Sequence, residues 1–201
     1  MNLKKKFFHK AYKTKNQYEV DKLYSDWANT YDNELDKMGY ESPIRCATAL
    51  AQFVDLETPI LDFGCGTGLS GQALKHIGFK NVLATEINPD MWKIAAKKNI
   101  YADVLTTSFG NPLPSRKFLG LCAVGVISSG AGPASLIEGC LNCIKPGGFF
   151  CFSYNDHTLS NPSYVEAIKT ALMSGFAKEV FHKYGTHLKS KNIGSSVYVL
   201  Q

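Results

Sequence analysis

The sequence predicts an α/β fold with a mostly parallel sheet of seven strands, helices on both faces and an antiparallel hairpin at its C-terminal end. Three observations predict it. Between residues 59 and 173, short apolar runs alternate with segments of helical periodicity. The segments between these runs are long enough for the helical crossovers that parallel strands require. The last two apolar runs have no helix between them, which favours a hairpin.

Local start and stop signals delimit the elements. The expected helices are residues 18–38, 43–54, 69–77, 89–98, 133–144 and 163–173. The expected strands are residues 59–63, 81–85, 101–105, 118–127, 149–154, 176–188 and 196–200. The second helix opens at Ser42-Pro43, a cap residue before a first-turn proline, and Gly78 stops the third. Asn88 caps the fourth, with Pro89 at its first position.

Length and composition fit one globular domain. The chain has 201 residues, of which 45% are apolar and 19% charged, and this excludes disordered, collagenous and coiled-coil classes. The longest uncharged apolar run, 118–127, is about half of a membrane span, so we expect no transmembrane segment. No apolar stretch follows the N-terminal lysines as it would in a signal peptide, and we expect a cytoplasmic protein.

The net charge of +5 lies in an N-terminal arm. The first 22 residues hold seven lysines against two acidic residues, and the rest of the chain is balanced. Such an arm binds phosphate or an anionic membrane, or is only a solvated terminus, and we favour the solvated terminus. Cys140 and Cys143 form a C-x-x-C pair, but they share a helical face and no second pair follows at zinc spacing. We therefore expect core cysteines and no metal.

One segment carries the chemistry. Ile60-Leu-Asp-Phe-Gly-Cys-Gly-Thr-Gly68 joins the first strand of the alternating region to its helix. Three glycines at alternate positions let the backbone turn sharply and let a ligand lie directly on it. The N–H groups at the start of the helix face that ligand. Taken alone, such a loop serves a dinucleotide, a phosphate or only a tight turn.

Four details separate these possibilities. Asp62 precedes the first glycine by two residues, where a carboxylate suits an ammonium group and repels a pyrophosphate. The spacing is G-x-G-x-G, unlike the G-x-G-x-x-G of nicotinamide folds, and no Gly-Lys-Ser/Thr of a P-loop follows. Glu86 ends the second strand, where an acid can hold both ribose hydroxyls. Asp103 ends the third, where an acid can accept from an adenine amine.

With Ile144-Lys-Pro-Gly-Gly148 before the fifth strand, these motifs make residues 23–201 resemble the Rossmann-like class I S-adenosylmethionine-dependent methyltransferases. The segment 23–32 is similar to the lid helix of members that act on small molecules. Residues 27–32 and 125–133 are similar to the methyltransferase-like group that includes the Williams–Beuren region methyltransferase. The resemblance implies a basic arm and helical lid, 1–40, and an S-adenosylmethionine-binding domain, 41–201, in a single structural unit.

The resemblance also implies a set of cofactor-binding residues. They are, for the methionine end and its loop, Tyr31, Asp62, Gly64, Cys65, Gly66 and Gly68; for the ribose, Glu86; for the adenine, Ile87, Met91, Asp103 and Val104; and beside the sulfonium, Gly125. For Tyr31, the alternative to a hydrogen bond with the cofactor's carboxylate is a plain aromatic contact. Singly, Asp62 is also interpretable as a strand-end turn residue, Met91 as ordinary core and Asp103 as a loop residue.

Methyl transfer from a sulfonium is an in-line displacement that depends mainly on orientation, so a dedicated base is not always needed. His157 after the fifth strand is a weak candidate for a base because a free histidine has a pKa near neutrality. We favour a solvated loop position for it, and exposed strand positions for His182 and His187.

We expect a methyltransferase that acts on a small-molecule acceptor, because the lid segment is present and no added recognition domain is evident. One alternative is a methyltransferase for RNA or protein, docked through the lysine arm. Nucleic acid is the less favoured partner, and salt-dependent binding to a polyanion would identify it. Another alternative is a non-catalytic S-adenosylmethionine-binding protein. The acceptor atom and the oligomeric state stay open.

Overall fold

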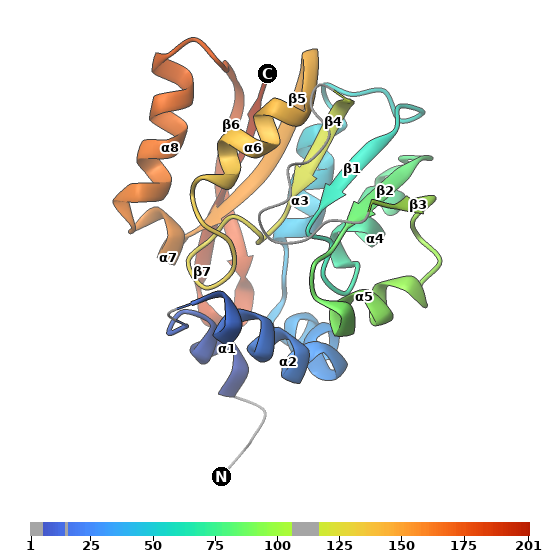
Figure 1. The fold of residues 1–201 in the computed structure, drawn as a ribbon, viewed down its shortest axis with the longest axis vertical. Helices are drawn as coiled ribbons and strands as arrows, with labels where there is room; N and C mark the ends of the chain where they lie inside the picture. The colour runs from blue at the N-terminus through green and yellow to red at the C-terminus, as the bar shows by residue number, and fades with distance from the viewer. Residues whose placement is uncertain (1–5, 15, 106–116) are drawn as a thin grey trace.

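A computed structural model describes residues 6–14, 16–105 and 117–201. Seven strands form one sheet in the order β3-β2-β1-β4-β5-β7-β6 (Figure 1). The strands are β1 (Ile60–Phe63), β2 (Val82–Thr85), β3 (Asp103–Val104), β4 (Phe118–Ala123), β5 (Ile144–Asn155), β6 (Glu179–Leu188) and β7 (Ile193–Leu200). The first five strands pair in parallel, and β7 pairs antiparallel with both β5 and β6. The predicted sheet and its C-terminal hairpin are confirmed.

Helices cover both faces of this sheet. They are α1 (Lys6–Ala11), α2 (Gln17–Met38), α3 (Ser42–Leu50), α4 (Leu69–Ile77), α5 (Pro89–Ala96), α6 (Leu136–Cys143), α7 (Asp156–Leu159) and α8 (Pro162–Met173). Side chains alternate along β5, so Phe150 and Phe152 pack with α6 and α8, while Cys151 packs with α3 and α4. Figure 1 shows α1 and α2 lying across the edge where the parallel strands end.

Several elements are shorter than the sequence predicts. The helix expected over 43–54 ends at Leu50, and the strand expected over 101–105 is reduced to Asp103–Val104. Ser42 is not the helix cap, because Glu41 holds that position and the Ser42 side chain is buried against other elements. β4 ends at Ala123, and the chain then turns at Gly125, whose φ is +72°. No helix in the described part of the chain is long and apolar enough to cross a membrane.

The N-terminal arm is the main departure from expectation. Residues 6–11 form a helix, and Phe8 and Ala11 are buried, so a solvated terminus is wrong for this segment. Phe8 packs in a cluster with Trp27 of α2. A Cβ on Gly130 would collide with the carbonyl of Ala11, so α1 also lies directly against the loop after β4. The lysines at 4, 5 and 15 lie outside the described residues.

Two neighbouring tyrosines, with ring centroids 5.7 Å apart, give a stability test of this core. The Tyr154 hydroxyl is buried and has no partner among the described residues, whereas the Tyr164 hydroxyl donates to the Gly132 carbonyl over 3.0 Å. Tyr154→Phe should raise the free energy of unfolding by about 1 kcal/mol, because an unpaired buried hydroxyl is removed. Tyr164→Phe should lower it by about 1 kcal/mol. Urea unfolding measures both, and a loss of stability in Tyr154→Phe would contradict the assignment.

Candidate active site

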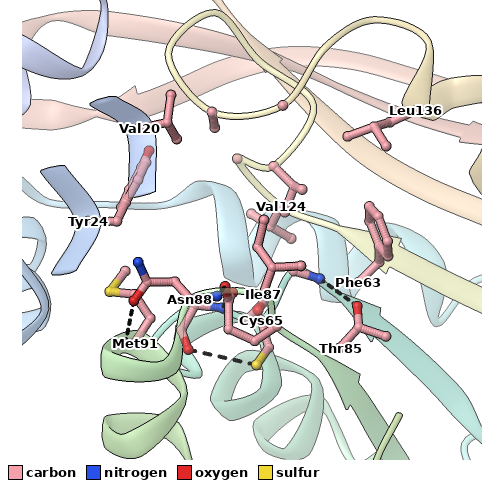
Figure 2. Close-up of a pocket in the computed structure, with 18 of the residues that line it drawn as sticks. Val20, Tyr24, Phe63, Cys65, Thr85, Ile87, Asn88, Met91, Val124 and Leu136 are labelled. Carbon is pink, nitrogen blue, oxygen red and sulfur yellow. Dashed lines mark hydrogen bonds between the residues drawn. The ribbon is translucent and has the colours of Figure 1, made fainter. Parts of the chain in front are cut away.

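A cavity of about 460 Å³ lies between α2 and the carboxyl ends of β1, β2 and β4. Its walls come from four parts of the chain: residues 17–43, residues 63–70 with the glycine loop, residues 85–91 and residues 124–140. Figure 2 shows Val20 and Tyr24 of α2 on one side of the cavity, and Phe63 and Thr85 on the other. The volume is in the range of small-molecule and cofactor sites.

The structure brings most of the predicted cofactor-binding residues together. Those that line the cavity are Tyr31, Gly64, Cys65, Gly66, Glu86, Ile87, Met91 and Gly125. Those that do not line it are Asp62, Gly68, Asp103 and Val104. Gly68 lies at the N-terminus of α4 as its cap, with φ +93°.

The glycine loop is shaped by left-handed backbone conformations. Gly64 has φ +66°, and a Cβ there would lie 2.7 Å from a methyl carbon of Val126, so this glycine lets the loop pack against the segment after β4. Gly66 has φ +56°, and the nearest heavy atom to its Cβ would be Met91 Cε, at 3.6 Å. The space in front of Gly66 is therefore part of the cavity, and a ligand can lie on its backbone there.

Asp62 lies behind this loop and not on the cavity wall. Its side chain is fully buried, and Oδ2 accepts hydrogen bonds from Ser70 Oγ at 2.7 Å and from the Tyr101 hydroxyl at 2.8 Å. Its other oxygen, Oδ1, has no partner among the described residues. Burial raises the pKa of Asp62 to about 6. In this geometry the carboxyl group links the end of β1 to Ser70 at the start of α4 and to Tyr101, and the predicted contact with an ammonium group stays a prediction.

Glu86 joins the end of β2 to the same loop. Its Oε2 accepts from the Gly66 N–H and its Oε1 from the Asn88 N–H, both at 2.7 Å. A second link lies beside it, because Thr85 Oγ1 accepts from the Gly64 N–H at 3.1 Å (Figure 2). Burial raises the pKa of Glu86. Its carboxylate thus lies at the cavity, at the strand end where the sequence predicts a ribose.

The predicted adenine-binding residues are only partly assembled. Met91 is buried and Ile87 is 43% exposed, and both line the cavity. Asp103 is exposed, and its Oδ1 accepts from the Val104 N–H at 2.8 Å. The chain from 106 to 116, which follows β3, lies outside the described residues.

The roof of the cavity is α2, and two groups of hydrogen bonds hold it down. Asp32 of α2 accepts from Thr67 Oγ1 of the glycine loop and from Lys98 Nζ, the latter at 2.6 Å. Asn88 Nδ2 donates to the Asp21 carbonyl at 2.9 Å and to Ser25 Oγ at 3.0 Å. The sequence indicates Asn88 only as a helix cap, so its contact with the roof was not predicted.

Three tyrosines, Tyr24, Tyr31 and Tyr40, line the cavity from above. Burial raises the pKa of each, so all three hydroxyls stay protonated at neutral pH. Tyr24 and Tyr31 both belong to the apolar stripe of the helix that the sequence predicts, whereas no sequence signal marks Tyr40.

Of the three histidines considered in the sequence, His157 and His182 are exposed as expected and His187 is not. His157 is exposed beside Tyr12, with ring centroids 4.1 Å apart, and it does not line the cavity. His182 is exposed as expected, but His187 is only 6% exposed, so the exposed position predicted for it is wrong. Cys140 and Cys143 are buried free thiols, and no cluster of three or more potential metal ligands occurs in the part of the chain that the structure describes.

The chain is similar in sequence to known methyltransferases. Residues 61–152 match the family model described as a methyltransferase domain. The human methyltransferase-like protein 27 is 31% identical over 156 residues, which cover 75% of this chain and 63% of that protein. The ubiquinone biosynthesis O-methyltransferase of Xylella fastidiosa is 27% identical over 107 residues, which cover 50% of this chain and 43% of that enzyme. This chain therefore matches less than two thirds of the length of either relative.

A solved structure supports the fold over the whole chain. A SAM-dependent methyltransferase of Leishmania major superposes with a TM-score of 0.67 at 13% sequence identity. The superposition covers 100% of this chain and 85% of that one. At such low identity, the likeness shows a shared fold.

The buried Asp62 makes stability depend on pH. Burial raises the pKa of Asp62 from 3.8 to about 6. Between pH 3.8 and about pH 6, the folded state therefore keeps a proton on this carboxyl group that the unfolded state has lost. The stability contribution is complete below about pH 4 and is lost as pH rises through about 6. Relative to Asp62→Asn, the wild-type free energy of unfolding should fall by about 3 kcal/mol from about pH 4 to about pH 7. Urea unfolding across this range measures it, and parallel curves for the two proteins would contradict it.

Proposed function

Because the chain belongs to the class I S-adenosylmethionine-dependent methyltransferases, we propose that it binds S-adenosylmethionine and transfers the methyl group to a small-molecule acceptor. The observation that carries this proposal is the cavity, whose floor is the open backbone at Gly66 and whose rim holds Glu86. The similarity to a ubiquinone biosynthesis O-methyltransferase supports a small-molecule acceptor.

The residues present fit the cofactor. We propose that the backbone at Gly64 and Gly66 holds the methionine end, that Glu86 binds the ribose hydroxyls, and that Ile87 and Met91 enclose the adenine. These five residues all line the one cavity, which supports the assignment. Asp62 then acts from behind the loop by fixing its shape. For Asp103 and Val104 the predicted adenine contact remains a proposal.

Bound S-adenosylmethionine supplies a methyl group on a positively charged sulfur, which is a good leaving group. The protein has to align the acceptor and keep water out. The roof formed by α2 serves both needs, since Asp32 and Asn88 tie it to the floor. This supports the proposal that residues 1–40 cover the domain formed by residues 41–201. A cytoplasmic location is also part of the proposal, and the six unpaired cysteines support it.

Gly66→Val tests the floor of the cavity. A branched side chain there would occupy ligand space, so affinity for S-adenosylhomocysteine should fall by about tenfold to a hundredfold. Gly147→Val is the matched control, because Gly147 also has a left-handed φ of +80° but has nothing within 4 Å of its Cβ. Calorimetry of both folded variants measures the effect. NAD should not bind to the wild type, and equal loss of affinity in both variants would count against the assignment.

The acceptor class can be tested with methyl-labelled S-adenosylmethionine and a metabolite extract. We expect label in the small-molecule fraction, detected by mass spectrometry, and none in RNA or protein added in parallel. Gly66→Val should strongly reduce the incorporation when the labelled cofactor is kept below saturation. Label in RNA, weakened by salt, would favour the macromolecular alternative. Cofactor binding with no incorporation into any fraction would favour a non-catalytic protein.

A further inference from the structure

A second cavity, of about 50 Å³, adjoins the first, and we call it the annex. The two cavities share Tyr24, Tyr31, Tyr40 and Gly125. The other walls of the annex come from α1, α2, the loop after β4 and the ends of β5 and β6. Since one water needs about 10–15 Å³, the annex has room for a group of about three heavy atoms.

His187 lines the annex, and its hydrogen bonds decide which ring nitrogen carries the proton. Its Nδ1 lies 2.8 Å from Ser42 Oγ, which lies 3.0 Å from Ser195 Oγ. Arg45 Nη1 donates to Ser195 Oγ at 2.8 Å. Among the described residues, Ser42 Oγ is the one acceptor within reach of the Ser195 hydroxyl. We therefore assign Ser195 as the donor to Ser42 and Ser42 as the donor to Nδ1, which leaves the ring proton on Nε2.

Burial lowers the pKa of His187 to about 4, so the ring is neutral at neutral pH. A neutral ring that accepts at Nδ1 can only donate at Nε2. The series of hydrogen bonds begins at a guanidinium, which polarises each link in the donating direction. His187 is thus a fixed donor, and its Nε2 makes no hydrogen bond among the described residues.

Trp27 is a second unused donor. It lines the annex and is only 2% exposed, and its indole N–H has no partner within the described residues. A buried N–H without a partner is costly, so such a group points to a ligand that completes it. Its ring is fixed by contacts with Tyr31 and Phe7, at centroid distances of 4.7 Å and 6.0 Å.

The other polar groups of the annex also favour an acceptor. The annex is lined by tyrosine, serine and asparagine side chains, and no aspartate or glutamate contributes to its described lining. Asn155 Nδ2 donates to the Tyr12 hydroxyl at 3.2 Å, so that hydroxyl can donate its own proton elsewhere. Burial raises the pKa of Tyr12 to about 12, which keeps this proton in place.

We propose that the annex is a carboxylate-binding subsite, in which the Trp27 indole N–H and the His187 Nε2–H donate to the two oxygens. A carboxylate has about three heavy atoms and accepts only, which matches the room and the donors. It can come from two sources, the methionine end of the cofactor or the acceptor itself. This choice of ligands rests on the proposed function, whereas the carboxylate chemistry rests on the annex alone.

The indole N–H signals test this directly. The chain has two tryptophans, so a ¹H–¹⁵N spectrum contains two indole signals. Trp92 packs against Tyr101 and lines neither cavity, so its signal is an internal control, assigned with Trp92→Phe. Acetate should move the Trp27 signal downfield and leave the Trp92 signal in place. Acetamide, a neutral probe of similar shape, should have little effect.

A histidine variant tests the second donor. His187→Asn keeps a polar atom near the position of Nδ1 for Ser42 and removes Nε2, so acetate should bind about tenfold more weakly. His182→Asn is the matched control, because His182 lies exposed on the same strand. An unchanged acetate titration in folded His187→Asn would overturn the role of His187.

Two nucleosides distinguish the sources of the carboxylate. S-adenosylhomocysteine carries a carboxylate and 5′-methylthioadenosine does not. If the cofactor fills the annex, S-adenosylhomocysteine moves the Trp27 signal and 5′-methylthioadenosine does not. Of the two loaded proteins, only the one saturated with 5′-methylthioadenosine then responds to acetate. If the acceptor fills it, acetate moves the signal in both loaded proteins.

Failure of the two proposals can be told apart. If calorimetry shows that neither nucleoside binds, the proposed function fails, and the acetate titration of the unloaded protein still tests the annex. If neither acetate nor S-adenosylhomocysteine moves the Trp27 signal in any arm, the annex proposal is overturned, whether or not the nucleosides bind.

Discussion

The Asp32 carboxylate is the contact on which the architecture of the site depends. Asp32 belongs to α2, and its carboxylate accepts hydrogen bonds from Thr67 in the glycine loop and from Lys98 after α5. Lys98 Nζ also donates to Gln72 Oε1 of α4 at 2.9 Å. One half-buried carboxylate therefore joins the roof, the floor and two flanking helices. Without it, the side-chain link from α2 to the glycine loop and to Lys98 would be lost, and α2 would depend on Asn88 and on apolar contacts such as that of Leu35 with Leu188.

The parts of this structure that could be predicted from sequence are those that local chemistry decides. Alternating apolar runs, the Asn88 cap and Gly78 place strands and helices because each signal acts within a few residues. The glycine loop and Glu86 could be placed because parallel strands end at one edge of a sheet. Bounds were less predictable, since α3 gives way after Leu50 to turns with local hydrogen bonds and β4 ends at Ala123, before the turn at Gly125.

The contacts that escaped prediction join residues far apart in the chain. Ser42 reads as a helix cap, and only the folded chain brings it to His187, 145 residues away. Phe8 lies within a lysine-rich arm, and the charge of this arm favours an exposed segment. In the structure Phe8 is nevertheless buried in a cluster with Trp27. Asp62 occupies the predicted strand end, but which way its side chain points depends on Tyr101. Gly71 in α4 leaves room for that tyrosine, because a Cβ there would collide with its hydroxyl.

The strand order has a consequence for the making of the protein. β7 leaves the ribosome after every other described strand, yet it lies inside the sheet, between β5 and β6. Until Ile193–Leu200 has emerged, β6 has no partner strand in the sheet, and one edge of β5 exposes unpaired backbone groups. The glycine loop and its surroundings are complete in sequence long before that moment. The nascent chain therefore carries an open sheet edge until β7 has emerged, and this strand also delivers Ser195 to its neighbours Ser42 and Arg45.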